Sequence, residues 1–251
     1  MLTTTIKRAI GKIFRIPKSL VNVRRVSALQ SSRSLRVHLG CGGDRLPDCI
    51  NIDYRLTPAT DVTMDLNVPR LAPSSVALAF SNAFFEHLYR PQRLPHLRRI
   101  RESLEDGGVC CYIGVPYFKN VAKFYLEKAP GTLGPVFDLY NVYRYTHGDP
   151  EHQQAWWLGQ LHKSLFDEEE LTGLLRDAGF QSFVMFCYGY PGDDHELPVT
   201  MGFFASGVAA PIEQLRERCL TFLGRFADQR IRFSTLVWLS AGETSSHATV
   251  Q

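Results

Sequence analysis

The run LRVHLGCGG at residues 35–43 decides the fold, because an apolar stretch of strand length breaks directly into glycines. We expect a buried strand over residues 35–39 followed by a tight turn. Glycine has no Cβ, so a ligand can approach the backbone of such a turn closely. The dinucleotide-binding GxGxxG motif fails, because Arg45 stands at its third glycine, and no GK[ST] follows to cradle a phosphate. A tight turn without any ligand is the alternative.

Short apolar runs continue downstream and alternate with helical patterns. Further strands are expected at residues 49–53, 61–65, 76–81, 109–115, 183–187 and 200–205. Helical spacing of apolar residues predicts a helix over 91–104, stopped by Asp106-Gly107-Gly108, and another over 167–178 that begins at a capping Asp167. Strands that alternate with helices predict an α/β fold with a mainly parallel sheet.

An acidic residue, Asp53, ends the second predicted strand. Its carboxylate can accept hydrogen bonds from the two hydroxyls of a ribose. Ligands of open α/β sheets bind outside the carboxyl ends of the strands, where both Asp53 and the glycine turn are expected. Asp53 follows Gly40 by only thirteen positions, against about twenty in a full dinucleotide-binding unit, so the first helix should be nearly absent.

Two segments do not follow the alternation of strands and helices. Residues 117–165 are long, aromatic and interrupted by glycine and proline, which is typical of a lid or binding cap. The aromatics suit a sugar ring, or they simply pack the core of the cap. Trp156 and Trp157 are neighbours, so at most one of them can face a ligand on a helix. Residues 211–240 predict a helix and then an apolar stretch at 233–239, to which we assign no function.

Basic residues gather at the N-terminal end of the chain. Nine of the 28 Lys and Arg residues, and none of the 25 Asp and Glu residues, lie within positions 1–36, so the remainder is net negative. Ile6, Ile10, Ile13 and Phe14 recur at helical spacing among these charges. This pattern suits a helix on an anionic membrane surface, a helix that caps the domain, or a transit peptide. A net negative body disfavours nucleic acid as a partner.

The overall composition favours a folded chain. Of the 251 residues, 45% are hydrophobic and 12% aromatic, which argues against disorder. No apolar run approaches the ~20 residues that a transmembrane helix needs. The six cysteines contain no CxxC pair, so we expect reduced, buried thiols in a cytosolic protein rather than zinc ligands or disulfides.

Taken together and in this order, five segments resemble the class I S-adenosylmethionine-dependent methyltransferases: LRVHLGCGG, INIDYR, DVTMDLN, FSNAFFEHLYR and LEDGGVCCYIGVP. The closest resemblance is to the branch associated with sugar and surface-polysaccharide biosynthesis. It covers residues 35–116 and resumes over 161–206. It implies a Rossmann-like fold with a mainly parallel seven-stranded sheet, a helical and aromatic cap at 117–165, and S-adenosylmethionine as cofactor.

The resemblance also divides the chain. Residues 1–34 would be a basic tail or helix, 35–207 the methyltransferase domain, and 208–251 a C-terminal helix and tail. The basic segment would allow peripheral contact with a membrane.

The cofactor-binding residues that the resemblance implies lie where four strands end. The turn at 40–42 would lie under the methionine moiety, Asp53 at the ribose, residues 65–66 at the adenine, and residues 81–82 beside the sulfonium. The full set is Gly40, Cys41, Gly42, Asp53, Asp65, Leu66, Ser81 and Asn82.

The chain also departs from the family. His38 stands where many relatives carry an acidic residue, and Asp44 replaces the third glycine of GxGxG. Asp106-Gly107-Gly108 corresponds to a PGG turn, and Glu86-His87 matches an EH motif. Some methyltransferases bind a divalent ion with an ExxEH motif and a distant histidine. Here Ala83 replaces the first acid, so we expect no metal.

Methyl transfer to an alcohol is an in-line displacement, and it also needs a base to take the proton of the acceptor. Histidine suits that task because its ordinary pKa lies near neutrality. His87 follows the fourth strand near the methyl end of the cofactor, and His162 opens the segment that returns to the sheet. Alternatively, His87 only binds backbone at a helix start, and His162, like His147 and His152, lies in solvent. The candidate catalytic residues are His87, His162, Glu86 and Tyr117.

These observations favour methyl transfer from S-adenosylmethionine to a hydroxyl of a sugar, glycan or other small molecule. The alternative is a protein of the same fold that transfers no methyl group and serves as a binding or scaffold component of a glycan-assembly system. The basic tail and the absence of an unmistakable base motivate that alternative. The acceptor and the oligomeric state do not follow from the sequence.

Overall fold

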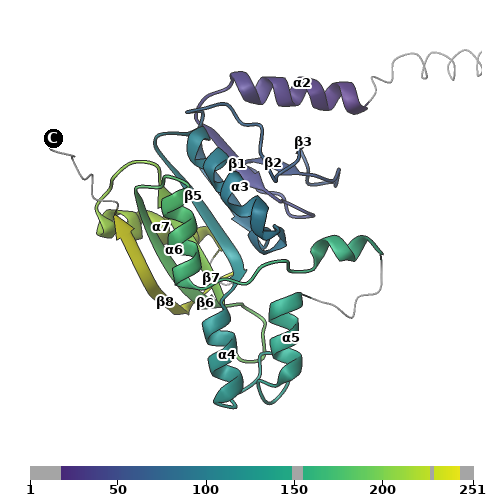
Figure 1. Ribbon diagram of the computed structural model, residues 1–251. Coiled ribbons are helices and arrows are strands. Elements are labelled where there is room, and N and C mark those ends of the chain that lie inside the picture. Colours follow the sequence, from purple (N-terminus) through teal and green to yellow (C-terminus); the bar gives the residue numbers. More distant parts are fainter. Residues whose placement is uncertain (1–17, 149–154, 227–228, 244–251) are drawn as a thin grey trace, which may run out of the picture.

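The computed structural model of the chain describes residues 18–148, 155–226 and 229–243. Within these ranges the strands form one eight-stranded sheet in the order β3-β2-β1-β4-β5-β7-β6-β8 (Figure 1). The strands are β1 (Leu35–Leu39), β2 (Ile50–Asp53), β3 (Val62–Thr63), β4 (Val76–Asn82), β5 (Leu104–Pro116), β6 (Ser182–Gly189), β7 (Thr200–Ser206) and β8 (Arg232–Glu243).

Helices connect the strands and cover both faces of the sheet. The α-helices of the described ranges are α2 (Lys18–Ser31), α3 (Arg90–Ser103), α4 (Phe118–Leu126), α5 (Leu139–His147), α6 (Glu168–Asp177) and α7 (Ile212–Leu223). Short 3-10 helices are η1 (Phe85–His87), η2 (Ala155–Gln160) and η3 (Gly224–Phe226).

The first five strands are parallel to one another, as expected of an α/β fold. The chain runs outward from β1 through β2 to β3, and then returns to place β4 on the other side of β1. The strand order therefore reverses between β1 and β4. In open α/β sheets, this reversal opens a crevice at the carboxyl ends of the strands in which ligands bind.

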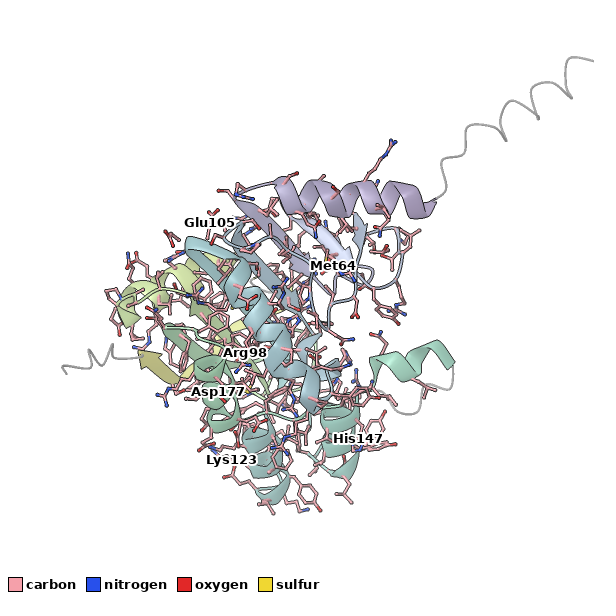
Figure 2. All side chains as sticks on the ribbon, turned by 45° about the horizontal axis from the view of Figure 1, so that its top comes forward. Met64, Arg98, Glu105, Lys123, His147 and Asp177 are labelled. Carbon is pink, nitrogen blue, oxygen red and sulfur yellow. The ribbon has the colours of Figure 1, made fainter. Side chains whose placement is uncertain are left out.

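Alternating side chains of the strands feed two cores. Leu35, Val37 and Leu39 of β1 face the same core as α2, α3 and α6. His38 faces the opposite layer, where it packs against Phe80 beside α7 and η3. Figure 2 shows Arg98 of α3 beside Asp177 of α6, and the Arg98 Nε donates to the Asp177 carbonyl over 3.3 Å.

Most of the predicted strands and helices are confirmed within one to three residues at their ends. Asp167 caps α6 as expected, since its Oδ1 accepts a hydrogen bond of 2.9 Å from the Glu170 N–H. The prediction that Asp106-Gly107-Gly108 stops the preceding helix is wrong. The helix ends at Ser103, and the three residues lie inside β5, where the pairing with β4 shifts register.

The predicted number of strands, seven, is also wrong, because the described sheet has an eighth strand, β8. It comes from the apolar stretch at 233–239, and it pairs antiparallel with β6. The buried Leu215, Cys219 and Leu223 of helix α7 pack in the same core as Val184 and Phe186 of β6. Strand β8 thus extends the sheet beyond β6, and α7 packs beside it.

Helix α2 packs on the sheet edge near β3. Its Asn22 side chain exchanges two hydrogen bonds of 2.9 Å with the backbone of Thr63, and Leu29 is buried. Residues 18–31 therefore belong to a helix that caps the domain. The amphipathic pattern of residues 6–14 lies outside the described residues. None of the described helices is long and apolar enough to cross a membrane.

The segment 117–165 follows β5, and its described residues, 117–148 and 155–165, include α4, α5 (Figure 1) and η2. Phe137 is fully buried in a small core with Val121 and Val199, so part of the aromatic content packs the insertion itself. His152 and the side chains of Trp156 and Trp157 lie outside the described parts. All six cysteines are buried and unpaired, as expected.

Candidate functional site

A pocket of about 520 Å³ opens at the carboxyl ends of β1, β2 and β4. We call it the glycine-loop pocket. It lies where the strand order reverses, the position at which this type of sheet binds ligands. Five of the predicted cofactor-binding residues line it: Gly40, Gly42, Asp53, Asp65 and Leu66. The volume lies within the range typical of small-molecule and cofactor sites.

Asp53 holds the glycine turn in place. Its Oδ2 accepts a hydrogen bond of 2.8 Å from the Gly42 N–H, and its Oδ1 accepts one of 2.8 Å from the Arg55 N–H. The carboxylate is buried, yet it lines the pocket. A carboxylate has about four acceptor positions, so two hydrogen bonds leave capacity for the hydroxyls of a ligand.

Gly40 is required by its surroundings. Its φ of +69° lies in the left-handed region, and an added Cβ would come within 2.7 Å of the Cβ and Cγ of Phe84. Gly42, at a φ of +54°, has open space where a Cβ would stand, with no atom within 4 Å. The two glycines therefore serve different needs: Gly40 makes room for Phe84, and Gly42 completes the turn.

The far wall of the pocket follows β3. Leu66 is buried, and its carbonyl accepts a hydrogen bond of 2.6 Å from Nδ1 of His96. Asp65 is exposed, and its Oδ1 accepts from the Asn67 N–H over 2.9 Å. A carboxylate beside an apolar side chain can bind the amine and the face of a flat heterocycle.

Three predicted cofactor residues do not line this pocket. Cys41 is buried beneath the turn, with its Sγ 3.8 Å from the Thr60 hydroxyl. The Ser81 hydroxyl donates to the Leu39 carbonyl over 2.9 Å, so it ties β4 to β1. The Asn82 side chain hydrogen-bonds the Tyr190 hydroxyl instead. These three residues support the walls of the site.

His38, which replaces an acid of the resembling family, lies in the core behind the sheet. It is 1% exposed, and its Nδ1 lies 3.2 Å from Oδ1 of Asn51. Burial lowers the pKa of His38 to about 4, so the ring is neutral at pH 7. The His38 side chain therefore does not line the glycine-loop pocket.

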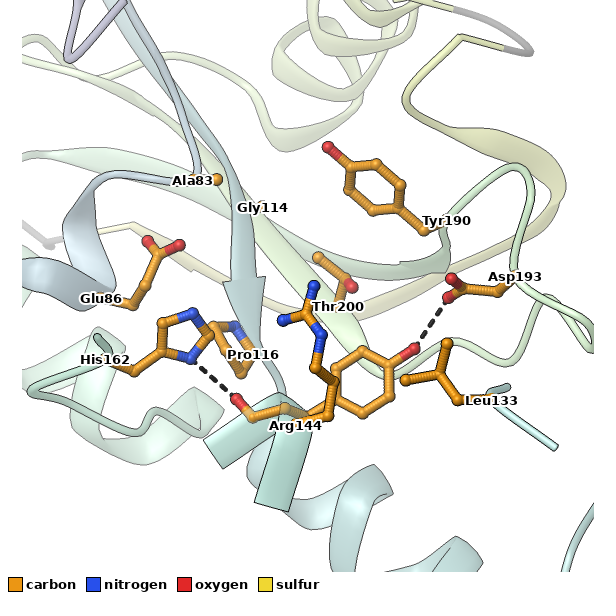
Figure 3. A pocket seen from close by; sticks show the side chains of 11 residues that line it. Ala83, Glu86, Gly114, Pro116, Leu133, Arg144, His162, Tyr190, Asp193 and Thr200 are labelled. Carbon is orange, nitrogen blue, oxygen red and sulfur yellow. Dashed lines mark hydrogen bonds between the residues drawn. The ribbon is translucent and has the colours of Figure 1, made fainter. Parts of the chain in front are cut away.

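A second pocket, of about 300 Å³, lies on the other side of Ala83 and is named the Arg144 pocket. Figure 3 shows the guanidinium of Arg144 reaching from α5 into this space. Tyr145 donates a hydrogen bond of 2.7 Å to Asp193, and Tyr190 lies on the opposite wall. Ala83 lines both pockets, so they adjoin.

Sequence reasoning missed the residues that distant segments bring to these pockets. Arg144, Tyr190 and Asp193 come from α5 and from the loop after β6, and Gln160 comes from η2. Their spacing carries no signal. Tyr54 directly follows Asp53 and lines the glycine-loop pocket, so adjacency to the predicted acid could have identified it.

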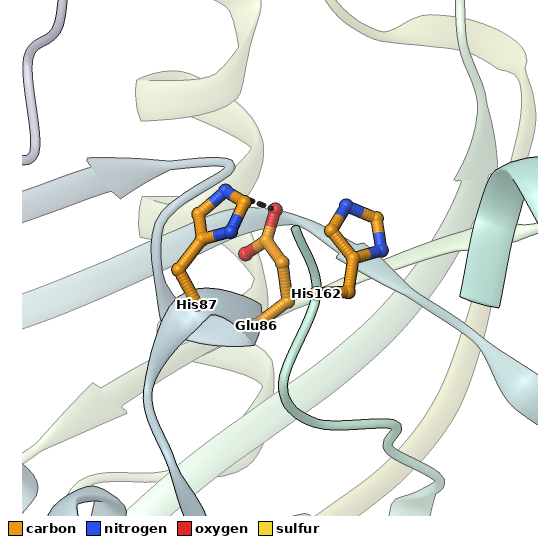
Figure 4. Close-up of side chains that lie close together, drawn as sticks. All are labelled: Glu86, His87 and His162. Carbon is orange, nitrogen blue, oxygen red and sulfur yellow. Dashed lines mark ion pairs between the residues drawn. The ribbon is translucent and has the colours of Figure 1, made fainter. Parts of the chain in front are cut away.

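Three predicted catalytic residues, Glu86, His87 and His162, meet where the two pockets adjoin. We call them the junction cluster. Glu86 and His162 line the Arg144 pocket, while His87 lines the glycine-loop pocket. Figure 4 shows Glu86 between the two imidazoles, and its Oε1 lies 3.8 Å from Nε2 of His87. Seventy-five positions separate His87 from His162, so only the fold unites them.

Burial sets the protonation of the cluster. Glu86 is 1% exposed, and desolvation raises the pKa of its carboxyl to about 8. Desolvation, together with a smaller effect of the neighbouring His87, lowers the pKa of His162 to about 4. It also lowers the pKa of His87, against the effect of the carbonyls of Leu161 and Ala83. Near pH 7 both imidazoles are therefore neutral.

The other candidates lie apart from the cluster. Tyr117 lines neither pocket, and its hydroxyl hydrogen-bonds Glu168. Burial and that carboxylate raise its pKa, which suits a structural role. His147 is exposed at the end of α5, as expected, with its Nδ1 2.7 Å from the Thr146 hydroxyl.

No protein-family model matches the chain, and no curated protein matches it. Its fold is similar to solved structures described as SAM-dependent methyltransferases. One from Thermotoga maritima, described as a possible histamine N-methyltransferase, is 14% identical with a TM-score of 0.45, over 75% of this chain and 88% of that one. One from Methanosarcina mazei is 14% identical with a TM-score of 0.46, over 73% and 97%.

A third, from Archaeoglobus fulgidus, is 15% identical with a TM-score of 0.44, over 79% of this chain and 98% of that one. At these identities and TM-scores the likeness carries no weight for the activity. The function has to come from the pockets of this chain and from the residues that line them.

Proposed function

We propose that this chain transfers the methyl group of S-adenosylmethionine to a hydroxyl of a small molecule, with a sugar or glycan as the preferred class. One observation carries the proposal: the glycine-loop pocket, with Asp53 and Asp65 on its walls, adjoins the Arg144 pocket at Ala83. A donor in the first pocket and an acceptor in the second would meet at the junction cluster.

The glycine-loop pocket offers groups suited to each part of the donor. The free acceptor capacity of Asp53 suits the ribose hydroxyls, and Asp65 with Leu66 suits the amine and face of the adenine. The methionine moiety would then extend along residues 40–42 towards Ala83. This placement points the sulfonium at the Arg144 pocket.

The Arg144 pocket suits an oxygen-rich acceptor. Arg144 and Tyr190 offer hydrogen-bond donors, and Pro116 and Leu133 add apolar surface. A well-placed acceptor in line with the methyl group can account for ~7–11 kcal/mol of the barrier. His87 and His162 are neutral near pH 7, so without a bound cation either imidazole can accept the hydroxyl proton, and the pKa of about 4 makes His162 a weak base. General-base catalysis of this kind is typically worth 10²–10⁴-fold in rate.

Calorimetric titration with S-adenosylhomocysteine tests the proposal. The wild type should bind, and Asp53→Ala should raise Kd by about 10- to 150-fold, because a hydrogen bond to a charged group is worth about 1.5–3 kcal/mol. Glu213→Ala is the matched control, since Glu213 is an exposed acid on α7 whose only ion pair is with Arg216 within the described chain. Equal affinity of all three proteins would refute the assignment of Asp53.

The alternative of a binding or scaffold protein makes a different prediction for the same preparation. It would bind the nucleoside tightly and transfer no methyl group to a broad panel of glycans and small alcohols. Methyl transfer that disappears in an Arg144→Gln variant would exclude this alternative, because a scaffold has no need for an acceptor-binding guanidinium beside the donor.

A further inference from the structure

The junction cluster brings together three side chains of types that bind metal ions. One ligand atom each from Glu86, His87 and His162 lies within 4.8 Å of the other two. We propose that these three side chains bind one divalent transition-metal cation between the two pockets. The proposal concerns metal binding by the cluster alone, so it does not require the chain to bind S-adenosylmethionine.

The hydrogen bonds of the two histidines leave the correct nitrogen free. His162 Nδ1 lies 2.8 Å from the Tyr145 carbonyl, and His87 Nδ1 lies 3.1 Å from the Leu161 carbonyl. A carbonyl oxygen can only accept, so each Nδ1 carries the proton, and in the neutral rings each Nε2 keeps its lone pair. The Ala83 carbonyl also faces the His87 ring, and the ring would turn from it on binding the ion. Metal-binding histidines are oriented in this way, because donation of the other ring N–H fixes the tautomer and the ring.

Glu86 supplies the observation that points to a ligand. Its side chain is 1% exposed, and its Oε2 has no hydrogen-bond partner among the described residues. A buried polar oxygen without a hydrogen-bond partner is costly, and a bound cation would supply the missing partner. Lys163 does not fill this role, because its ammonium donates to backbone carbonyls, including that of Leu161 over 2.6 Å.

The ligand set selects the class of cation. Two imidazoles and one carboxylate with open positions suit Fe²⁺, Zn²⁺ and related first-row ions. Ca²⁺ and Mg²⁺ prefer oxygen ligands. Metal–ligand bonds of about 2.0–2.2 Å place the ligands of one ion roughly 3.4 Å apart. The ligand atoms, which lie within 4.8 Å of one another, would therefore move closer by up to about 1.4 Å around the ion, and the proton of Glu86 would pass to solvent.

The side chain of Ala83 carries no ligand atom, so it leaves space for a further ligand on the side of the junction where the two pockets adjoin. With the proposed function, an acceptor hydroxyl would coordinate there. A bound cation lowers the pKa of a coordinated oxygen, so the hydroxyl would lose its proton to solvent and become a better nucleophile. The negative oxygen would also balance the charge of the ion next to Arg144.

Metal uptake by the full chain tests the proposal. After treatment with a chelator and dialysis, the protein would be titrated with Co²⁺, followed by its visible absorption, and with Zn²⁺, followed by elemental analysis. We expect one ion per chain. Loss of a direct ligand in Glu86→Gln or His162→Gln should raise Kd by about 100-fold or more, above the 10- to 100-fold typical of supporting residues.

His147→Gln is the matched control, because His147 is exposed and lies outside the cluster. It should keep wild-type affinity and the same Co²⁺ spectrum. Glu86→Gln could fail to fold, so His162→Gln, at a half-buried position, gives an independent test, and circular dichroism checks both. No stoichiometric uptake by the wild type would overturn the proposal, as would uptake that survives in a folded ligand variant.

The same samples separate this proposal from the proposed function. S-adenosylhomocysteine binding without stoichiometric metal would leave the donor site standing and remove the metal centre. Metal binding without nucleoside binding would do the reverse.

Discussion

Gly40 and Asp53 show how single residues build the site before any ligand enters. The Asp53 carboxylate ties the turn at Gly42 to β2, and Gly40 leaves the space that Phe84 occupies. The sequence suggested that glycine permits the close approach of a ligand. In the structure the close approach at Gly40 is made by a side chain of the protein, which is itself part of the pocket wall.

This arrangement predicts different costs at the two glycines. Gly40→Ala would place a Cβ 2.7 Å from Phe84 at a positive φ, so Phe84 must move into the pocket. We expect a loss of stability of more than about 2 kcal/mol and weaker nucleoside binding. Gly42→Ala, which meets no atom within 4 Å, should lose about 1 kcal/mol from the positive φ alone. Urea unfolding of both variants would contradict this if their losses are equal.

At the scale of elements, sequence patterns predicted the strands and helices whose position depends on residues that are close together in the chain. The apolar run and glycines at 35–43 predicted β1 and its turn, and the capping Asp167 predicted the start of α6. Asp106-Gly107-Gly108 was misread, because glycines after a helix look like a stop signal, whereas here they allow β5 to change register against β4. Strand β8 was missed because pairing with β6 is a long-range choice.

The candidate site also has a part that the sequence predicts and a part that depends on contacts between distant segments. Its donor half follows strands in sequence order, so the residues at the ends of β1, β2 and β3 could be predicted. Cys41, Ser81 and Asn82 lie in that same region, but backbone conformation turns their side chains to structural partners. Its acceptor half depends on where α5, η2 and the loop after β6 fold back, which no motif encodes.

At the scale of the whole molecule, buried ionisable groups couple stability to pH. Burial lowers the pKa of both His38 and His96 to about 4, below the ordinary 6.5. As the pH falls below 6.5, these two histidines bind protons in the unfolded chain but stay neutral in the folded state. The free energy of unfolding of the protein therefore decreases on acidification. Glu86 acts in the opposite direction, because its raised pKa costs stability as the pH rises above about 4.5.

The contribution of His38 can be isolated by substitution. Between pH 7 and pH 5 it should remove about 2 kcal/mol from the free energy of unfolding, as follows from a pKa of about 4 against 6.5. His38→Gln, which keeps a donor towards Asn51, should lose about 2 kcal/mol less than the wild type over that range. Urea unfolding at both pH values measures the difference. An identical loss in both proteins would show that His38 does not resist protonation in the fold.

The position of a bound donor product tests the central claim most directly. In a crystal structure with S-adenosylhomocysteine, the ribose hydroxyls should lie on Asp53, the adenine between Asp65 and Leu66, and the sulfur near Ala83, facing the junction cluster. Density for the nucleoside at another place on the molecule, or a glycine-loop pocket that stays free of it at saturating concentration, would contradict the account.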